Sequence, residues 1–232
     1  MATKEIKKTA RIAGFLYLIM APLGMFGMSP FDPADAATRA SNIMASESLF
    51  RLGIVSALMV QIVNILVVLV LYKLLKPVNK THALLMVIFL LLGVPIAMLS
   101  QLNKFAALLL LSGADYLTVF TADQLQALAP LFLDLHEHGL SIAGIFWGLW
   151  LFPMGYLVFK SGYIPRILGV LLIIGCFGYL IDSVTFFVFP NFVATISQFT
   201  DLTWVGELLL ALWLLIKGVN VEQWEKRALE SA

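Results

Sequence analysis

The chain has little charge and almost no cysteine. Only 12% of its 232 residues are Asp, Glu, Lys or Arg, whereas soluble globular proteins have about 25%. Hydrophobic residues make up 61% of the sequence, and the mean hydropathy is +0.95. This composition excludes an ordinary soluble domain and predicts contact with lipid. The net charge of +1 gives no reason to expect nucleic acid as a partner.

Cys176 is the only cysteine, and it lies inside an apolar run. A single thiol excludes an internal disulfide and a cysteine-rich metal site. The sequence also lacks a His-Glu-x-x-His motif, which is the helical signature of zinc proteases.

Long apolar runs dominate what is present. A helix needs about 20 residues to cross about 30 Å of hydrocarbon, because lipid cannot satisfy backbone amides. The sequence therefore predicts an all-α, polytopic transmembrane bundle in which residues 1–232 form a single integral-membrane domain. The six predicted spans are 12–28, 54–75, 82–111, 139–159, 167–189 and 202–216.

Lysine and arginine gather in every second connection between these runs, which accounts for twelve of the fifteen basic residues. Only Arg39, Arg51 and Lys104 are left for the opposite side. The positive-inside rule then predicts that both termini are cytoplasmic. The twelve are Lys4, Lys7, Lys8, Arg11, Lys73, Lys76, Lys80, Lys160, Arg166, Lys217, Lys226 and Arg227.

The first span has an alternative interpretation as a cleavable signal. A basic start, an apolar core and the Ala34-Asp35-Ala36 triplet together resemble a secretory signal and its cleavage site. Cleavage would leave five spans and place the mature N-terminus outside.

Two acidic residues fall inside predicted spans, where a charge costs at least about 2.5–3.5 kcal/mol. Glu207 precedes Lys217 by ten residues, which predicts a position near mid-membrane. The alternative is that the sixth helix starts later and Glu207 lies near its outer end. Asp182, on a face with Gly175 and Gly178, either lines a polar interior or hydrogen-bonds a neighbouring helix end.

The densest polar string, residues 134–139, is expected at the outer end of the fourth span. Asp134 and His138 are four residues apart, so they share a helical face and could bind one divalent metal ion, with Asp182 as a third ligand. The sequence predicts that His136 points elsewhere. An interfacial helix end solvated by water explains the same string equally well.

Amides and one lysine complete the polar set. Gln61 and Asn64 share a face in the middle of the second span, and Asn103 and Lys104 lie toward the outer end of the third. Together these groups predict an outward-facing pocket for a small solute or cation. Its predicted residues are Glu207, Asp182, Asp134, His138, Gln61, Asn64, Asn103 and Lys104.

Three functions remain open from the sequence. The first is binding or movement of a small solute or cation through the outward-facing pocket. The second is a membrane-embedded, metal-dependent hydrolase acting on a lipid or small amphiphile. The third is a non-catalytic membrane subunit or regulator. The oligomeric state is not determined by the sequence.

Several short sequence segments carry information that composition alone does not give. They are Ala10-Arg11-Ile12-Ala13-Gly14, Leu74-Leu75-Lys76-Pro77-Val78-Asn79-Lys80, Lys160-Ser161-Gly162-Tyr163-Ile164-Pro165-Arg166, Gly206-Glu207 and Lys217-Gly218-Val219-Asn220. From about Thr9 to Trp224 the chain resembles a family of bacterial multi-pass membrane proteins known as domain of unknown function 4386. This resemblance implies a retained first helix and a bacterial cytoplasmic (inner) membrane, and it supplies no catalytic residue.

Overall fold

The computed structural model describes residues 2–28 and 36–230, and every regular element within them is a helix. This confirms the all-α fold class. The long helices are α1 (Ala2–Met28), α3 (Glu47–Leu75), α4 (Lys80–Leu111), α5 (Ala122–Ser161) and α6 (Arg166–Val188). The shorter elements are α2 (Ala36–Ala45), η1 (Asp115–Leu117), η2 (Pro190–Phe192), α7 (Val193–Thr200), η3 (Asp201–Trp204), α8 (Val205–Ile216) and α9 (Val221–Glu230).

Six helical segments are long and apolar enough to cross a membrane, which confirms the predicted number of spans. Ala34 and Asp35 of the possible cleavage triplet lie outside the described residues, so cleavage stays a prediction. The six segments are Glu5–Phe26, Glu47–Leu75, Lys80–Leu111, Ala122–Ser161, Arg166–Val188 and Pro190–Ile216.

The helix that carries the fourth predicted span, α5, begins at Ala122, well before residue 139. Thr121 and Gln124 form a capping box: the Thr121 amide donates to Gln124 Oε1 at 2.9 Å, and the Gln124 amide donates to Thr121 Oγ1 at 3.3 Å. These two bonds satisfy amides that a helix start otherwise leaves unpaired. The polar string 134–139 therefore lies within a helix and not at its end.

The predicted sixth span, 202–216, is not one continuous α-helix. The apolar segment Pro190–Ile216 that contains it consists of η2, α7, the 3₁₀ turn η3 and α8. Thr203 Oγ1 donates to the Thr200 carbonyl at 2.6 Å, and such side-chain bonds to the backbone compete with regular α-helical pairing. The helix is thus interrupted where threonines cluster, immediately before Val205.

Residue contacts group the chain into two compact units. Unit 1 comprises Met1–Met20, Val63–Val94 and Ser141–Ala232, and unit 2 comprises Ala21–Ile62 and Pro95–Leu140. The boundaries fall inside α1, α3, α4 and α5. The assignment of the whole chain to a single domain stays a prediction.

Unit 1 gathers the basic connections at one end. The Leu74 carbonyl, in the last turn of α3, accepts hydrogen bonds from the Tyr163 hydroxyl at 2.8 Å and from Trp224 Nε1 at 2.9 Å. Carbonyls in the last turn of a helix lack intrahelical partners, so both donors satisfy one of them. Burial raises the pKa of Tyr163 above its ordinary value of 10, which keeps this hydroxyl protonated as a donor at neutral pH.

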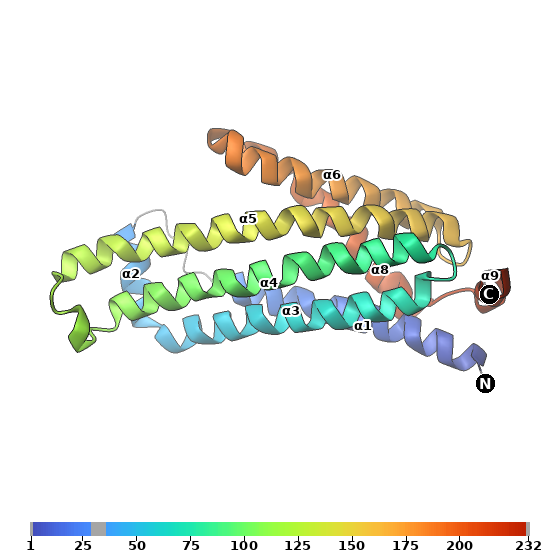
Figure 1. The fold of residues 1–232 in the computed structure, drawn as a ribbon, viewed down its shortest axis with the longest axis horizontal. Helices are drawn as coiled ribbons and strands as arrows, with labels where there is room; N and C mark the ends of the chain where they lie inside the picture. Colours follow the sequence, from blue (N-terminus) through green and yellow to red (C-terminus); the bar gives the residue numbers. More distant parts are fainter. Residues whose placement is uncertain (1, 29–35, 231–232) are drawn as a thin grey trace. The chain divides into compact units, whose positions relative to one another are not determined.

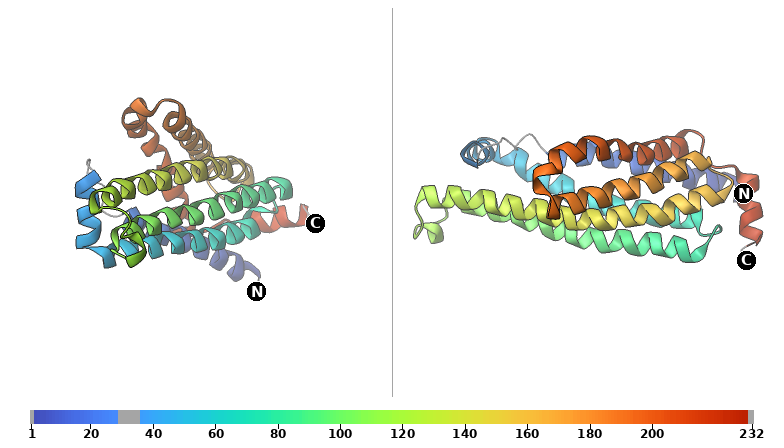
Figure 2. Two further views of the ribbon diagram at one scale, coloured as in Figure 1. Left: turned by 60° about the vertical axis from the view of Figure 1, so that its left-hand side comes forward. Right: turned by 90° about the horizontal axis from the view of Figure 1, so that it is seen from above.

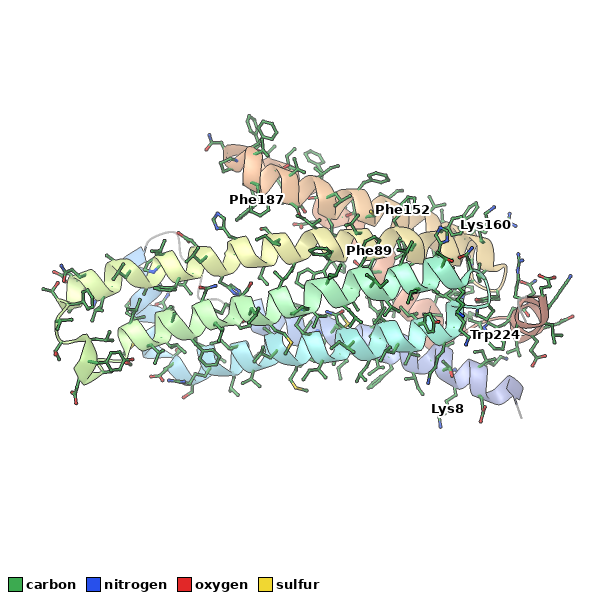
Figure 3. The ribbon with its side chains drawn as sticks, viewed as in Figure 1. Lys8, Phe89, Phe152, Lys160, Phe187 and Trp224 are labelled. Atoms are coloured by element: carbon green, nitrogen blue, oxygen red, sulfur yellow. The ribbon has the colours of Figure 1, made fainter. Side chains whose placement is uncertain are left out.

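The same end holds the start of α1 and the whole of α9, as two views agree (Figures 1 and 2). Arg227 donates to the Lys160 carbonyl at 3.3 Å, and the Asn220 amide donates to the Tyr163 carbonyl at 3.2 Å. Figure 3 shows Lys8, Lys160 and Trp224 at this end. Within unit 1 the basic connections thus lie together, as the positive-inside pattern requires.

Replacing both Tyr163 and Trp224 with phenylalanine is expected to release α9 from unit 1. Each substitution removes one hydrogen-bond donor to the Leu74 carbonyl and costs about 1 kcal/mol. The two losses together raise the population of protein with α9 undocked roughly 30-fold. Trypsin cleavage after Lys226 and Arg227 should accelerate accordingly. Trp204→Phe is the control, because Trp204 is 49% exposed; an equal acceleration there would contradict docking through Leu74.

Unit 2 has its own apolar core, in which α2 and the outer halves of α3, α4 and α5 meet. The Ser56 hydroxyl donates to the Leu23 carbonyl at 2.7 Å, which links α3 to α1 within this unit. The core residues are Ile43, Phe50, Ile54, Ala107, Leu108, Ala129 and Leu133.

Glycines set the close contact between α5 and α6, as the Gly144-x-x-x-Gly148 spacing predicts. A Cβ on Gly148 would lie 2.8 Å from Tyr179 Cβ. Gly155 and Gly169 face each other: a Cβ on either would lie 2.5–2.6 Å from the other's carbonyl oxygen. Only glycine permits backbones to approach this closely.

Candidate functional site: a buried carboxylate at a helix break

Glu207 lies in the first turn of α8, directly after the η3 break, and is half-buried. The late helix start agrees with the alternative left open by the sequence. Ten residues still separate Glu207 from Lys217, which is about 15 Å along the helix axis. Glu207 therefore keeps its expected distance from the basic end while lying at a helix start.

Two tyrosines hold the Glu207 carboxylate. The Tyr17 hydroxyl of α1 donates to Glu207 Oε2, and the Tyr179 hydroxyl of α6 donates to the same carboxylate. Tyr17 is buried and its ring stacks on Trp150 of α5, with centroids 6.0 Å apart and an interplanar angle of 18°. The carboxylate is thus held by neutral donors from two other helices, as intramembrane charges require.

Small residues bring these helices close enough for the tyrosines to reach Glu207. A Cβ on Gly14 of α1 would lie 2.5 Å from both the Ala211 carbonyl oxygen and the Leu215 amide nitrogen of α8. A Cβ on Gly206 would lie 2.9 Å from Leu171 Cβ of α6. Glu207 consequently lies at a tight three-helix junction of α1, α6 and α8.

Asp182 of α6 holds the helix that precedes the break. Its Oδ1 accepts hydrogen bonds from Thr200 Oγ1 at 2.6 Å and from Ser197 Oγ at 3.3 Å. Both donors belong to α7, so the structure shows the expected bond to a neighbouring helix end. These two hydrogen bonds fix the last turn of α7 against α6.

Tyr179, which binds Glu207, lies close to Asp182. It lies three residues before Asp182 on α6, and this spacing places both side chains on one helical face. Gly178 lies against the Thr203 side chain, whose Cβ would be 3.0 Å from a glycine Cβ. The described residues of unit 1 therefore contain one polar path from Tyr17 through Glu207 and Tyr179 toward Asp182, bordering the break in the sixth span.

Asp134 and His138 are both exposed in unit 2. His138 Nδ1 donates to the Asp134 backbone carbonyl at 2.7 Å, four residues earlier on α5. This bond uses one ring nitrogen of His138 within α5.

His136 is the buried histidine of this string, 2% exposed. Its Nδ1 donates to the Ser100 backbone carbonyl of α4 at 3.0 Å. Gly139, one turn later, lies against the Ser100 side chain. The sequence correctly predicts that His136 points away from Asp134 and His138, and the structure shows that it joins α5 to α4.

Replacing His136 is therefore expected to matter more than replacing His138. His136→Ala removes a buried donor and leaves a void between α4 and α5, so it should lower the free energy of unfolding by about 2 kcal/mol. His138→Ala, at an exposed position, should change it by less than about 0.5 kcal/mol. Unfolding in mixed detergent micelles measures both, and the reverse order would contradict these placements.

The remaining predicted residues are distributed over α3 and α4. Gln61 and Asn64 are buried at 6% and 5% exposure. Lys104 is half-buried with its ammonium 5.9 Å from the centre of the Phe50 ring, and Asn103 is half-buried beside it. Of the eight predicted pocket residues, Glu207 and Asp182 both lie near Tyr179. Convergence of the eight on one ligand stays a prediction.

The sequence matches the family described as Domain of unknown function (DUF4386) over residues 12–218. The chain belongs to this family. A protein of Archaeoglobus fulgidus, described only as an uncharacterized protein, is 32% identical over 172 residues that cover 74% of this chain and 86% of the relative. No solved structure matches the chain. Membership of DUF4386 confirms the resemblance, and this relative is archaeal.

Membership of DUF4386 assigns no ligand or reaction to this chain. Any metal site must therefore be inferred from the His, Cys, Asp and Glu side chains. Across residues 2–28 and 36–230, no three His, Cys, Asp or Glu side chains are grouped as a metal site requires. Asp134, His138 and Asp182 as ligands of a divalent metal, and the hydrolase that would use it, stay predictions. No specific observation favours them or the regulator alternative.

The sequence interpretation of this DUF4386 chain overlooked Tyr17 and Tyr179. Tyr17 and Glu207 are 190 positions apart, so no local spacing relates them. A signal was nevertheless available: a tyrosine hydroxyl buried in a membrane helix needs a partner, and Gly14 one turn before Tyr17 marks a helix contact.

Proposed function

We propose that this protein binds or moves a small solute or cation through its polar interior, with Glu207 as the principal ligand. The carrying observation is a carboxylate held by two neutral phenols at a break in a membrane-spanning segment. Among the described residues Glu207 has no ion-pair partner, so its ionised form has an unneutralised negative charge. A cation or a cationic solute would complete this site.

The break supports the same proposal. Interrupted helices in transporters free backbone groups near the midplane, and these groups then coordinate ions or substrate. Here η3, which includes Thr203, follows the Thr200 that binds Asp182 and leads directly into the turn that carries Glu207. Asp182 would be a second anionic group on the route from Glu207 toward the outer side, where the predicted pocket opens.

The membrane location and the orientation of the chain are also part of the proposal. We place the chain in a cytoplasmic membrane with the basic connections inside, because twelve of fifteen cationic residues fall on that side of the predicted topology.

Ion flux into proteoliposomes tests the proposal. Uptake of radioactive sodium ion and of protons, the latter followed with a pH-sensitive dye, is expected for the wild type. Glu207→Gln should abolish it and Asp182→Asn should reduce it at least tenfold, because each removes the charge without removing the acceptor oxygen. Glu47→Gln is the matched control, since Glu47 is exposed and paired with Arg51 at 2.7 Å.

Two results would contradict the proposal. One is flux by correctly folded Glu207→Gln equal to that of the wild type. The other is a wild-type protein that shows neither flux nor saturable binding of sodium ion or protons.

A further inference from the structure

A second feature of unit 1 is independent of Glu207. A surface hollow of about 560 Å³ lies between α1 and α8, at the end that holds the basic connections. Its lining changes from cationic to apolar along α1. The lining residues are Lys7, Lys8, Arg11, Ile12, Phe15 and Leu215.

The cationic part of the hollow lacks a counter-charge. Lys7, Lys8 and Arg11 are exposed, and none has an ion-pair partner among the described residues. Lys7 and Arg11 are four residues apart, so like charges face each other on one side of the helix. An anion bound at this place would relieve that repulsion.

The apolar part follows within two turns. Ile12 and Phe15 of α1 are exposed hydrophobic side chains, at 41% and 56%, and Leu215 closes the hollow from α8. Lys8 and Phe15 are seven residues apart, about 10 Å along the axis. Charge at the rim and hydrocarbon 10 Å deeper match the order of groups in a membrane phospholipid.

The wall of the hollow is rigid where the two parts meet. Gly14 brings the α1 backbone against Ala211 and Leu215 of α8 so closely that even a methyl group would not fit. Lys8 projects from α1 at this end, as Figure 3 shows. A fixed cleft between two helices binds a lipid for longer than a mobile surface patch, because less order is lost on binding.

We propose that this hollow binds an anionic phospholipid of the surrounding leaflet, with its phosphodiester between Lys7, Lys8 and Arg11 and an acyl chain along Ile12, Phe15 and Leu215. The headgroup carries one negative charge, as in phosphatidylglycerol. This site does not depend on ligand binding at Glu207.

Lipid binding to the purified full-length chain, measured by native mass spectrometry, tests the assignment. We expect phosphatidylglycerol to bind at least tenfold more tightly than zwitterionic phosphatidylcholine. The combined variant Lys7→Gln, Lys8→Gln, Arg11→Gln should weaken phosphatidylglycerol binding roughly 100-fold, since each cation near a headgroup contributes about fivefold. A matched variant with Lys73→Gln, Lys76→Gln and Lys80→Gln, three cations at the same end but outside the hollow, should retain wild-type affinity.

A second variant keeps the charge and removes the space. Leu215→Trp fills the apolar part and should weaken phosphatidylglycerol binding about tenfold by displacing acyl-chain contact, while leaving the three cations in place. This variant stays informative if the charge variant fails to fold.

Three results would overturn the assignment. The first is an equal loss in the Lys73, Lys76 and Lys80 variant, which would show a general attraction to basic surfaces. The second is wild-type affinity in a folded Leu215→Trp. The third is displacement of the lipid by millimolar inorganic phosphate, which would indicate a site for free phosphate.

Discussion

Gly169→Ala is expected to lower the free energy of unfolding by about 3 kcal/mol or more, one of the two largest effects we predict. A Cβ at this position would lie 2.5 Å from the Gly155 carbonyl oxygen and 2.6 Å from the Phe159 amide nitrogen. Both are backbone atoms of α5, so relief requires α5 and α6 to separate along their contact and to lose the packing between them. Unfolding in mixed detergent micelles measures the loss.

Gly24→Ala is the matched control for this prediction. Gly24 also lies within a helix, but nothing is within 4 Å of the position its Cβ would occupy. Alanine is the better helix former by about 1 kcal/mol, so this variant should be equally or slightly more stable. If both substitutions behaved alike, glycine contact would not be what holds α5 against α6.

The combined change Tyr17→Phe and Tyr179→Phe is expected to destabilise the protein by about 3 kcal/mol or more. Both rings remain, including the stack of Tyr17 on Trp150, so packing is preserved. The Glu207 carboxylate, however, loses both of its hydroxyl donors. Leaving a half-buried carboxylate inside a helix bundle without partners costs more than losing an ordinary hydrogen bond.

Adding Glu207→Gln to this double variant should restore part of the lost stability, because a neutral amide is less costly to leave unpaired than a carboxylate. The three substitutions would then be strongly non-additive, as groups in direct contact are. Tyr156→Phe is the control, since the Tyr156 ring stacks on His82 at 4.3 Å and phenylalanine retains that contact. Strict additivity would show that the tyrosines and Glu207 do not act on each other.

The sequence predicted six spans because each depends on local composition. Each span is a continuous apolar run, and each basic connection follows a helix end such as Leu75 or Ser161. The glycine contact at Gly148 was predictable for the same reason, since its four-residue spacing from Gly144 is visible in one helix.

The helix boundaries were predicted less well because polar residues conceal them. The capping pair Thr121 and Gln124 is present in the sequence, but the carboxylates and histidines of residues 134–138 made the segment resemble a membrane boundary. The break before Val205 depends on Thr203 bonding to the Thr200 carbonyl, and threonine occurs in many unbroken helices.

The candidate site was only half predictable. Intramembrane position singled out Glu207 and Asp182 from the sequence alone. Their partners Tyr17, Tyr179 and Thr200 come from helices whose packing is decided by tertiary contacts, which no single-sequence pattern encodes. His136 and His138 are only two residues apart, yet tertiary packing buries His136 and leaves His138 exposed. The sequence pattern alone does not distinguish them in this way.

The central claim is a chain that crosses the membrane six times with its basic connections and both termini on the inner side. Cysteine mapping on a Cys176→Ser background tests it most directly, because Cys176 is the only native thiol. Thr81→Cys and Gln223→Cys should react with a membrane-impermeant maleimide only after cells are permeabilised, and Thr118→Cys should react in intact cells. Labelling of Thr81→Cys and Gln223→Cys from opposite sides would contradict the account.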